Sequence, residues 1–224
     1  MSKKIILIAG PTASGKSKLA IEIAKKIKGE IINADSMQVY KEFSVLSSRP
    51  SKKDLKKAKH HLYGFQPAKK LFSTGSWLKL VKKQINLCLK NKKTPILVGG
   101  TGLYFEAITK GMSKIPNINF KSRDEVRKLQ KKIGQKKFYE KLLKLDPLIK
   151  NKIEPFDVQR SVRAYEVKKL TKKSIFEWYK LTKSEFKQFQ IFKIFIDTPR
   201  EKLLKNISNR VKQMFKNDCI KEVK

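Results

Sequence analysis

Short runs of apolar residues recur through the first half of the chain, and polar loops follow several of them. Residues 5–9 read IILIA, residues 31–34 read IINA and residues 94–98 read TPILV. Unbroken runs of this length are typical of strands buried on both faces of a parallel sheet. We therefore predict strands at 5–9, 30–34 and 94–98, and a further short strand at 61–65.

Segments with helical spacing separate these strands. Residues 77–89 place apolar side chains at intervals of three and four, and helices are also predicted at 17–28, 51–59 and 103–108. Strands that alternate with helices form a parallel sheet, and ligands of such sheets lie at the carboxyl ends of the strands. The polar segments 10–17, 35–38 and 99–102 are therefore expected to share one cleft.

The pattern changes between about residue 116 and residue 188, where the chain is highly charged and has few strand signals. One amphipathic helix ends at Asp146-Pro147 and another begins at residue 157, before a strand at 191–196 and a helix at 199–215. We predict a sheet core of residues 1–115 and 189–224 that carries a helical insertion, 116–188. Aromatic residues of the insertion are expected in its core, namely Phe156, Tyr165, Phe176, Trp178 and Tyr179.

The loop after the first strand fits the phosphate-binding pattern G-x-x-x-x-G-K-[ST]. Its glycines let the backbone curl so that successive N–H groups point at phosphate oxygens, while the lysine and the following helix add positive charge. The terminal serine hydroxyl is a ligand for Mg2+. A polyphosphate site is predicted, although the motif alone leaves the polyphosphate and the reaction open; its residues are Gly10, Pro11, Thr12, Ala13, Ser14, Gly15, Lys16 and Ser17.

The charge of the chain points to a partner rich in phosphate. It has 54 Lys and Arg against 19 Asp and Glu, a net charge of +35. The excess is spread along the whole chain, so a general bias in composition is the alternative to a nucleic-acid surface.

The cysteine content and the hydropathy pattern limit the classes of protein to which the chain can belong. The two cysteines, Cys88 and Cys219, are too few for a disulfide framework and lack metal-ligand spacing, which favours a reducing cytoplasm. His60-His61 suggests a metal ligand, but no third ligand is near it in sequence. No run of 18 apolar residues or signal peptide is recognised, so we expect no membrane contact.

Six segments in order make the chain resemble the tRNA dimethylallyltransferase (isopentenyltransferase) family. They are GPTASGKS at 10–17, INADSMQVYK at 32–41, HHLYGF at 60–65, PILVGGTGLYFEAI at 95–108, DVQRSVRAYEV at 157–167 and NRVKQMF at 209–215. The resemblance implies a P-loop kinase-like α/β fold. It also implies transfer of a dimethylallyl group from dimethylallyl diphosphate to N6 of adenosine 37 in tRNAs that read codons beginning with U. Mg2+ as cofactor and a monomeric enzyme are expected with it.

The resemblance assigns roles to particular residues. Asp35 resembles the general base that accepts the N6 proton, and its alternatives are a helix N-cap or an outer-sphere ligand of Mg2+. Thr101 resembles the residue that hydrogen-bonds the bridging oxygen of the leaving group, and capping of the next helix is its alternative. Arg210 resembles a residue that neutralises diphosphate, and an exposed helix charge is its alternative.

Two further strips resemble the family's tRNA contacts. The flipped adenine is expected to meet residues that follow the second strand, and the insertion is expected to grip the RNA backbone. These residues are Asp35, Ser36, Met37, Gln38, Thr101, Arg123, Gln159, Arg160, Ser161, Val162 and Arg163.

One departure from the family pattern concerns the end of the chain. The family continues beyond the segment that resembles 216–224, and residues 217–219 lack a glycine usual at that turn. A fragment, a truncated gene and a minimal variant are all compatible with this. The rival functions are a small-molecule P-loop kinase and an RNA-binding remnant without turnover.

Overall fold

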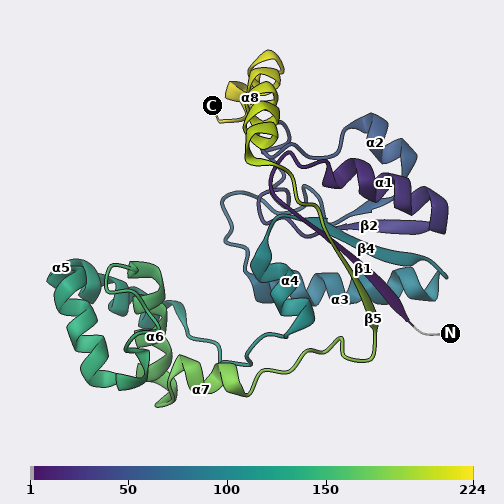
Figure 1. Ribbon diagram of the computed structural model, residues 1–224. Coiled ribbons are helices and arrows are strands. Elements are labelled where there is room, and N and C mark those ends of the chain that lie inside the picture. Colours follow the sequence, from purple (N-terminus) through teal and green to yellow (C-terminus); the bar gives the residue numbers. More distant parts are fainter. Residues whose placement is uncertain (1–2, 224) are drawn as a thin grey trace. The chain divides into compact units, whose positions relative to one another are not determined.

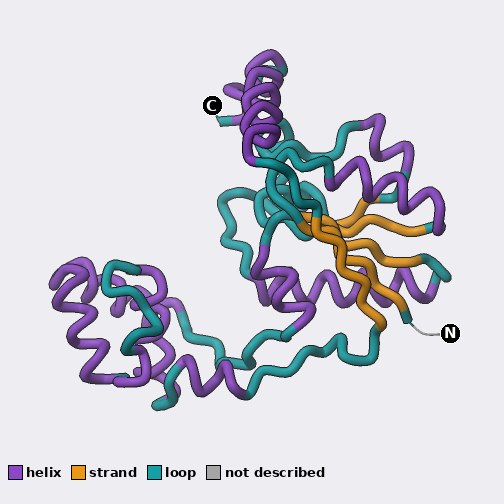
Figure 2. Tube along the Cα trace, in the orientation of Figure 1, coloured by secondary structure: helices purple, strands orange, loops and turns teal. Residues whose placement is uncertain are grey.

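A computed structural model describes residues 3–223 and divides the chain into two compact units. Unit 1 comprises Met1–Thr109 and Ser184–Lys224, and unit 2 comprises Lys110–Lys183. The structural boundaries lie a few residues before the predicted ones. The strands belong to unit 1, and every element within unit 2 is helical (Figure 2).

Unit 1 is built on a five-stranded, fully parallel sheet with the order β3-β2-β4-β1-β5 (Figure 1). The α/β fold predicted from the alternating pattern is confirmed. The strands are β1 (Lys4–Ala9), β2 (Gly29–Asn33), β3 (His60–His61), β4 (Thr94–Gly99) and β5 (Gln190–Phe195). The helices of this unit are α1 (Lys16–Ile27), α2 (Lys52–Lys57), α3 (Thr74–Lys90), α4 (Gly102–Thr109) and α8 (Arg200–Lys216), followed by the short 3-10 helix η2 (Cys219–Glu222).

Both faces of the sheet are covered along β1, β2 and β4, as their unbroken apolar runs require, whereas edge strand β5 is largely exposed. Helix α1 packs on one face, where Ala20 and Ile21 join strand residues such as Ile8, Ile31 and Ile96. Helices α3 and α4 cover the other face, with Trp77 stacked on Tyr104 at 4.1 Å between ring centroids; the remaining buried residues of this face include Ile5, Leu7, Ile32, Ala34, Val81, Ile85, Cys88, Leu97 and Ile108.

The strand predicted at 61–65 is wrong beyond His61. Leu62 and Gly64 have positive φ values of 62° and 55°, in the left-handed region, so the backbone leaves the extended conformation after two residues. This turn positions Tyr63 beyond the carboxyl end of β3, where it lines the two cavities described below.

Unit 2 has its own apolar core, formed mainly by α5 (Phe120–Leu145) and α6 (Val158–Thr171), with η1 (Pro147–Ile149) and α7 (Ile175–Lys180). Gly134, at φ 76° and ψ 164°, interrupts α5. Tyr165 lies in this core, but Phe156 is 87% exposed and Tyr179 is 52% exposed, so the prediction that both are core residues is wrong. Phe176 and Trp178 are half-buried against the core.

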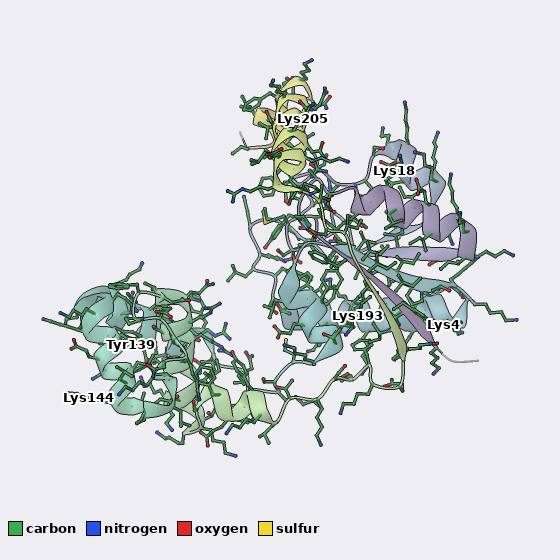
Figure 3. The ribbon with its side chains drawn as sticks, in the orientation of Figure 1. Lys4, Lys18, Tyr139, Lys144, Lys193 and Lys205 are labelled. Carbon is green, nitrogen blue, oxygen red and sulfur yellow. The ribbon has the colours of Figure 1, made fainter. Side chains whose placement is uncertain are left out.

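Basic side chains project from many elements rather than from one surface. Figure 3 shows Lys4 on β1, Lys18 on α1, Lys193 on β5 and Lys205 on α8, with Lys144 on α5 of unit 2. Within residues 3–223, no helix combines the length and the apolarity that crossing a membrane requires.

Candidate active site

The phosphate loop joins the end of β1 to the start of α1. Gly15 has a φ of +91° and precedes the first residue of α1, a conformation that favours glycine. Ala13 is also left-handed, at φ +63°, and its carbonyl accepts a hydrogen bond from Asn206 Nδ2 of α8 at 3.1 Å. The loop is thus curled as the motif requires and is tied to α8, a contact that the motif did not predict.

Lys16 lies partly buried within this loop. Its Nζ donates to the carbonyl oxygen of Pro11 at 2.5 Å. Burial lowers the pKa of Lys16 from its ordinary 10.5; the negative charge of Asp35 acts in the opposite direction, and the positive charge of Arg210 adds to the lowering. Lys16 therefore shares one electrostatic environment with Asp35, the predicted general base, and with Arg210, the predicted diphosphate ligand.

A cavity of about 500 Å³ brings the separate segments together. Its wall includes residues 12–17 of the phosphate loop with Lys18 of α1, Asp35 after β2, Gly99 at the end of β4, and Arg210 on α8. Met37, Gln38 and Tyr63 also line it. Convergence of strand ends and loops on one concave site is the usual placement of a ligand in an open parallel sheet.

The backbone around Asp35 is fixed by the buried Asn33. The Asn33 amide Nδ2 donates to the carbonyls of Asp35 and Leu62, at 2.9 and 3.0 Å, and its Oδ1 accepts from the Asp35 N–H at 2.9 Å. One carboxylate oxygen of Asp35, Oδ1, accepts from the Met37 N–H at 2.9 Å. These bonds hold the carboxylate at the cavity wall.

Gly99 lets the end of β4 approach the segment that carries Asp35. A Cβ added at Gly99 would lie 2.0 Å from the carbonyl oxygen of Ala34, which no side chain could tolerate. A glycine is therefore required at position 99 because two backbone segments pack closely there, and not because the chain needs flexibility.

Thr101 contacts Ser36, the residue after Asp35, but it does not line the cavity. Its Oγ1 accepts from the Ser36 N–H at 2.9 Å and donates to Ser36 Oγ at 3.2 Å. Its own N–H donates to the carbonyl of Ala34 at 3.3 Å. In this structure Thr101 thus connects the start of α4 to the 35–38 segment.

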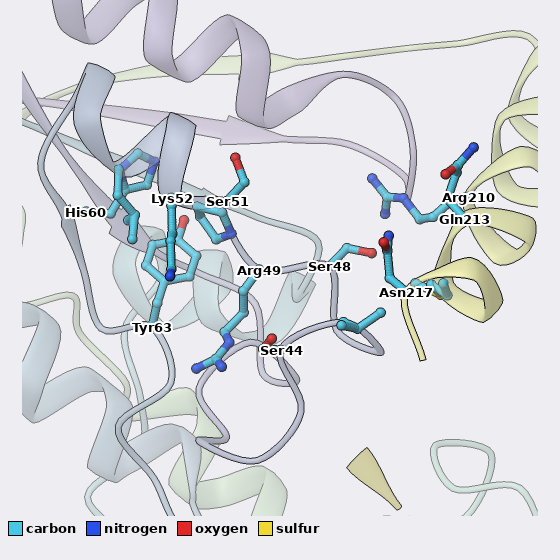
Figure 4. Close-up of a pocket in the computed structure, with 14 residues that line it drawn as sticks. Ser44, Ser48, Arg49, Ser51, Lys52, His60, Tyr63, Arg210, Gln213 and Asn217 are labelled. Atoms are coloured by element: carbon cyan, nitrogen blue, oxygen red, sulfur yellow. The ribbon is translucent and has the colours of Figure 1, made fainter. Parts of the chain in front are cut away.

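A second cavity of unit 1, about 670 Å³ in volume, shares Ser48, Tyr63, Arg210 and Met214 with the first. It lies between the 44–52 segment, from which Ser44, Ser48, Arg49, Ser51 and Lys52 line it, and the C-terminal part of unit 1 (Figure 4). That part contributes Arg210 and Gln213 of α8 and Asn217, which follows α8. The cations Arg49, Lys52 and Arg210 at its wall suit an anionic ligand.

Two residues of this region were missed by sequence reasoning. Burial, with a further contribution from Asp35, raises the pKa of Tyr63, which therefore stays a neutral phenol in both cavities. The Glu222 carboxylate accepts hydrogen bonds from the N–H groups of Ser44, Val45 and Leu46, at 2.9, 2.7 and 3.0 Å. Tyr63 could have been singled out because it belongs to the HHLYGF segment that carries the family resemblance. Glu222 could not, because no local pattern predicts a contact between residues more than 170 positions apart.

The insertion residues assigned to tRNA lie in unit 2 on α5 and α6, and they differ in exposure. The Arg160 side chain is 73% exposed and pairs with Asp157 at 3.4 Å. Arg163 and Arg123 both face the buried carboxylate of Glu166, at 3.3 and 4.0 Å. Gln159 is exposed, but Ser161 and Val162 are buried in the unit's own core, so their side chains do not face solvent.

Comparison with known proteins places the chain in a family. The IPP transferase family model matches residues 38–224. The chain belongs to the IPP transferase family. It is 58% identical over 221 residues to the tRNA dimethylallyltransferase of Pelagibacter ubique, covering 99% of this chain and 71% of that one. It is 43% identical to the Rickettsia bellii tRNA dimethylallyltransferase over 222 residues, covering 99% of this chain and 70% of that one.

Solved structures of IPP transferases have the same fold. A eukaryotic dimethylallyltransferase, solved acting on tRNA, matches with a TM-score of 0.83 and 28% identity, over 99% of this chain and 55% of that one. The tRNA isopentenylpyrophosphate transferase of Bacillus halodurans matches with a TM-score of 0.62 and 29% identity, over 98% of this chain and 68% of that one. The resemblance stated from the sequence is confirmed, and the family consists of prenyltransferases that modify tRNA.

Proposed function

We propose that this chain transfers the dimethylallyl group of dimethylallyl diphosphate to N6 of adenosine 37 in tRNAs that read codons beginning with U. The observation that carries the proposal is the single cavity lined by the phosphate loop, Asp35 and Arg210. A small-molecule kinase also uses a phosphate loop, but the family to which the chain belongs favours the prenyl donor over ATP.

The proposed reaction is a substitution at the allylic carbon. The N6 nitrogen of adenine forms a bond to that carbon while the carbon–oxygen bond to diphosphate breaks. Asp35 accepts the N6 proton, because the exocyclic nitrogen is weakly nucleophilic and must lose that proton during bond formation. The loop N–H groups, Lys16 and Arg210 neutralise the charge that develops on the departing diphosphate.

Thr101 has a positioning role and a direct role in this proposal. Its two hydrogen bonds to Ser36 hold the segment that carries Asp35, and rotation of its hydroxyl would let it donate to the bridging oxygen once diphosphate is bound.

The proposal includes Mg2+ as the cofactor. Mg2+ prefers oxygen ligands, and the Ser17 hydroxyl and the Asp35 carboxylate lie at the wall of the same cavity, so the donor set fits. When bound, the ion would supply positive charge to the diphosphate oxygens. Ser17 is the residue proposed to hold it.

The tRNA surface is proposed to include the 35–38 segment with Thr101 and, on unit 2, Arg123, Gln159, Arg160, Ser161, Val162 and Arg163. Adenine must leave the stack to react, and Asp35, Met37 and Gln38 of the 35–38 segment line the cavity that the flipped base would enter. Since Ser161 and Val162 are buried, we propose that they shape α6 and that the neighbouring arginines contact phosphate.

The decisive experiment uses labelled dimethylallyl diphosphate, Mg2+ and unmodified tRNA containing A36-A37. We expect label in the RNA with the native chain, and a loss of at least about 100-fold in rate with Asp35→Asn, which keeps the hydrogen-bond acceptor for Met37 but removes the base. Glu22→Gln, an exposed acid on α1, is the matched control and should retain full activity. Binding of tRNA without transfer would instead support the RNA-binding remnant, and ATP consumption without RNA would support the kinase.

The proposed monomeric state is tested separately by light scattering.

A further inference from the structure

Three side chains with metal-binding atoms meet in unit 1 away from the phosphate loop. The Glu30 carboxylate, the His61 imidazole and the Cys88 thiol each bring one ligand atom within 4.8 Å of the others. His61 Nε2 lies 2.7 Å from Glu30 Oε2, and Cys88 Sγ donates to the same oxygen at 3.5 Å. Glu30 is 5% exposed and Cys88 is fully buried.

The sheet register explains why residues so far apart in sequence converge. Ile32 of β2 is paired with His61 of β3, so Glu30, two residues before Ile32, shares the face of the sheet on which His61 lies. Helix α3 covers this face, and Cys88 in its last turn packs in the same cluster as Ile32. The site therefore depends on three elements, β2, β3 and α3.

The electrostatics of the cluster suit a cation. A buried carboxylate requires a compensating charge, and the cationic groups beside Glu30 are His61, when protonated, and Lys59, whose Nζ lies 3.8 Å from Oε1 on a side chain that is 76% exposed. Burial raises the pKa of the Cys88 thiol to about 11, although a hydrogen bond from Gln84 opposes this, so a metal that binds here must displace the thiol proton to solvent.

We propose that Glu30, His61 and Cys88 form a structural Zn2+ site. Thiolate, imidazole and carboxylate are the ligands that Zn2+ combines, whereas Mg2+ and Ca2+ select oxygen ligands alone. Coordination displaces the thiol proton of Cys88 and uses the neutral imidazole of His61. A water completes the tetrahedron on the side of His61, whose side chain is 25% exposed.

The three ligand atoms lie within 4.8 Å of one another, so coordination requires shifts on the order of 1 Å. Metal–ligand bonds of about 2.0–2.3 Å place tetrahedral ligand atoms roughly 3.3–3.8 Å apart. The Glu30–Cys88 distance of 3.5 Å already fits, and the Glu30–His61 distance of 2.7 Å must open by less than about 1 Å.

The site lies at the opposite end of β2 from the proposed catalytic base, so the role proposed for the ion is to stabilise the fold rather than to act in the transfer reaction. Glu30 is near the start of β2 and Asp35 follows its end, a separation of roughly 16 Å along an extended chain. The ion would join edge strand β3 to its neighbour and to α3, and so would stabilise the segment that leads from His61 to Tyr63.

The test uses metal-stripped native chain titrated with Co2+ and, separately, with Zn2+. We expect Co2+ to give a thiolate-to-cobalt charge-transfer band, and Zn2+ at about a hundredfold excess over its Kd to raise Tm by roughly 5–10 °C. Cys88→Ser should abolish the band, and Cys219→Ser, the matched buried cysteine, should retain it.

Several outcomes would overturn the site. These are the absence of a charge-transfer band in the folded native chain, a band that survives Cys88→Ser, or a band that depends on Cys219. His61→Gln provides a second variant, should Cys88→Ser fail to fold. Because the titration contains neither tRNA nor a prenyl donor, its result is independent of the proposed transferase activity.

Discussion

Lys16 and Asp35 line one cavity, but different hydrogen bonds hold their side chains in place. The Lys16 ammonium is partly buried and bonded to the Pro11 carbonyl, whereas Asp35 is held by Asn33 and by the Met37 N–H. A bound diphosphate would offer Lys16 charged oxygen atoms in place of one neutral carbonyl. The energetic consequence of ligand binding should therefore be largest at Lys16.

This difference predicts a pH dependence of diphosphate binding. Only protonated Lys16 attracts the anion, so affinity should be full below the lowered pKa of the free chain and should fall as pH rises through it. The decline should begin below the pH at which an ordinary lysine, with a pKa of 10.5, titrates. Calorimetric titration with inorganic diphosphate measures this.

The matched variant is Lys16→Met, expected to bind roughly 10–100-fold more weakly and to lose the decline over that range. A native profile parallel to that of Lys16→Met would exclude Lys16 as the source of the pH dependence.

At the scale of elements, helix α6 presents its arginines in two ways. Arg163, together with Arg123 of α5, neutralises the buried Glu166, so these arginines have a structural partner inside unit 2. Arg160 is largely exposed, and an ion pair of that kind contributes little to stability. The two positions should therefore respond differently to truncation.

We expect Arg160→Ala to weaken tRNA binding several-fold and to leave Tm unchanged. The slope of log affinity against log salt concentration should become shallower by about 1, the value for one lost phosphate contact. Arg163→Ala should lower stability by roughly 1–3 kcal/mol, because Glu166 keeps its buried charge with less compensation. Arg127→Ala, at an exposed position on α5, is the control. Binding assays and thermal unfolding distinguish the two effects, and equal loss of stability in both variants would contradict the distinction.

Helix η2 anchors the loop that lies between the two cavities. Partial burial would raise the pKa of the Glu222 carboxyl, but the N–H groups of Leu46, Val45 and Ser44 outweigh this and lower it. The stability that this anchor contributes is present above the ordinary carboxyl pKa and is lost as pH falls through the lowered one.

Glu222→Gln should speed hydrogen exchange of the three amides at least tenfold and reduce unfolding free energy by roughly 1–3 kcal/mol, since three charge-assisted hydrogen bonds are weakened. Exchange measured by mass spectrometry over peptides that contain 44–46 is the readout. Glu201→Gln on the exposed first turn of α8 should leave exchange unchanged. Unaltered exchange in Glu222→Gln would show that the loop is fixed by other contacts.

At the scale of the whole molecule, charge is distributed over both units and exceeds what the cavity needs. The net charge is +35, and lysines project from strands and helices alike (Figure 3). Charge of this kind attracts polyphosphates without selecting among them.

We therefore expect tRNA affinity to fall at least about 100-fold between about 50 and 200 mM salt, as for proteins that neutralise several phosphates. Fluorescence anisotropy of labelled tRNA measures this, and the Arg160→Ala titration supplies the comparison for one contact. A fall of less than about threefold would mean that most lysines only hydrate the surface.

The elements of unit 1 could be predicted because their signals are local. Unbroken apolar runs mark β1, β2 and β4, and the glycine-framed loop identifies a phosphate site before any tertiary contact is known. The prediction failed at 61–65, where positive φ values at Leu62 and Gly64 end the strand, and at Phe156, which a compositional argument placed in the core. Neither feature is determined by residue type alone.

By itself, the sequence determined the α/β class, the phosphate loop and the family resemblance, since each depends on residues close together in the chain. Only the tertiary structure decided that Asn206 bonds the phosphate loop, that Glu222 anchors residues 44–46, and that Glu30, His61 and Cys88 meet. These contacts join residues between 27 and about 190 positions apart. Strand register and helix packing bring them together, and neither can be read from local periodicity.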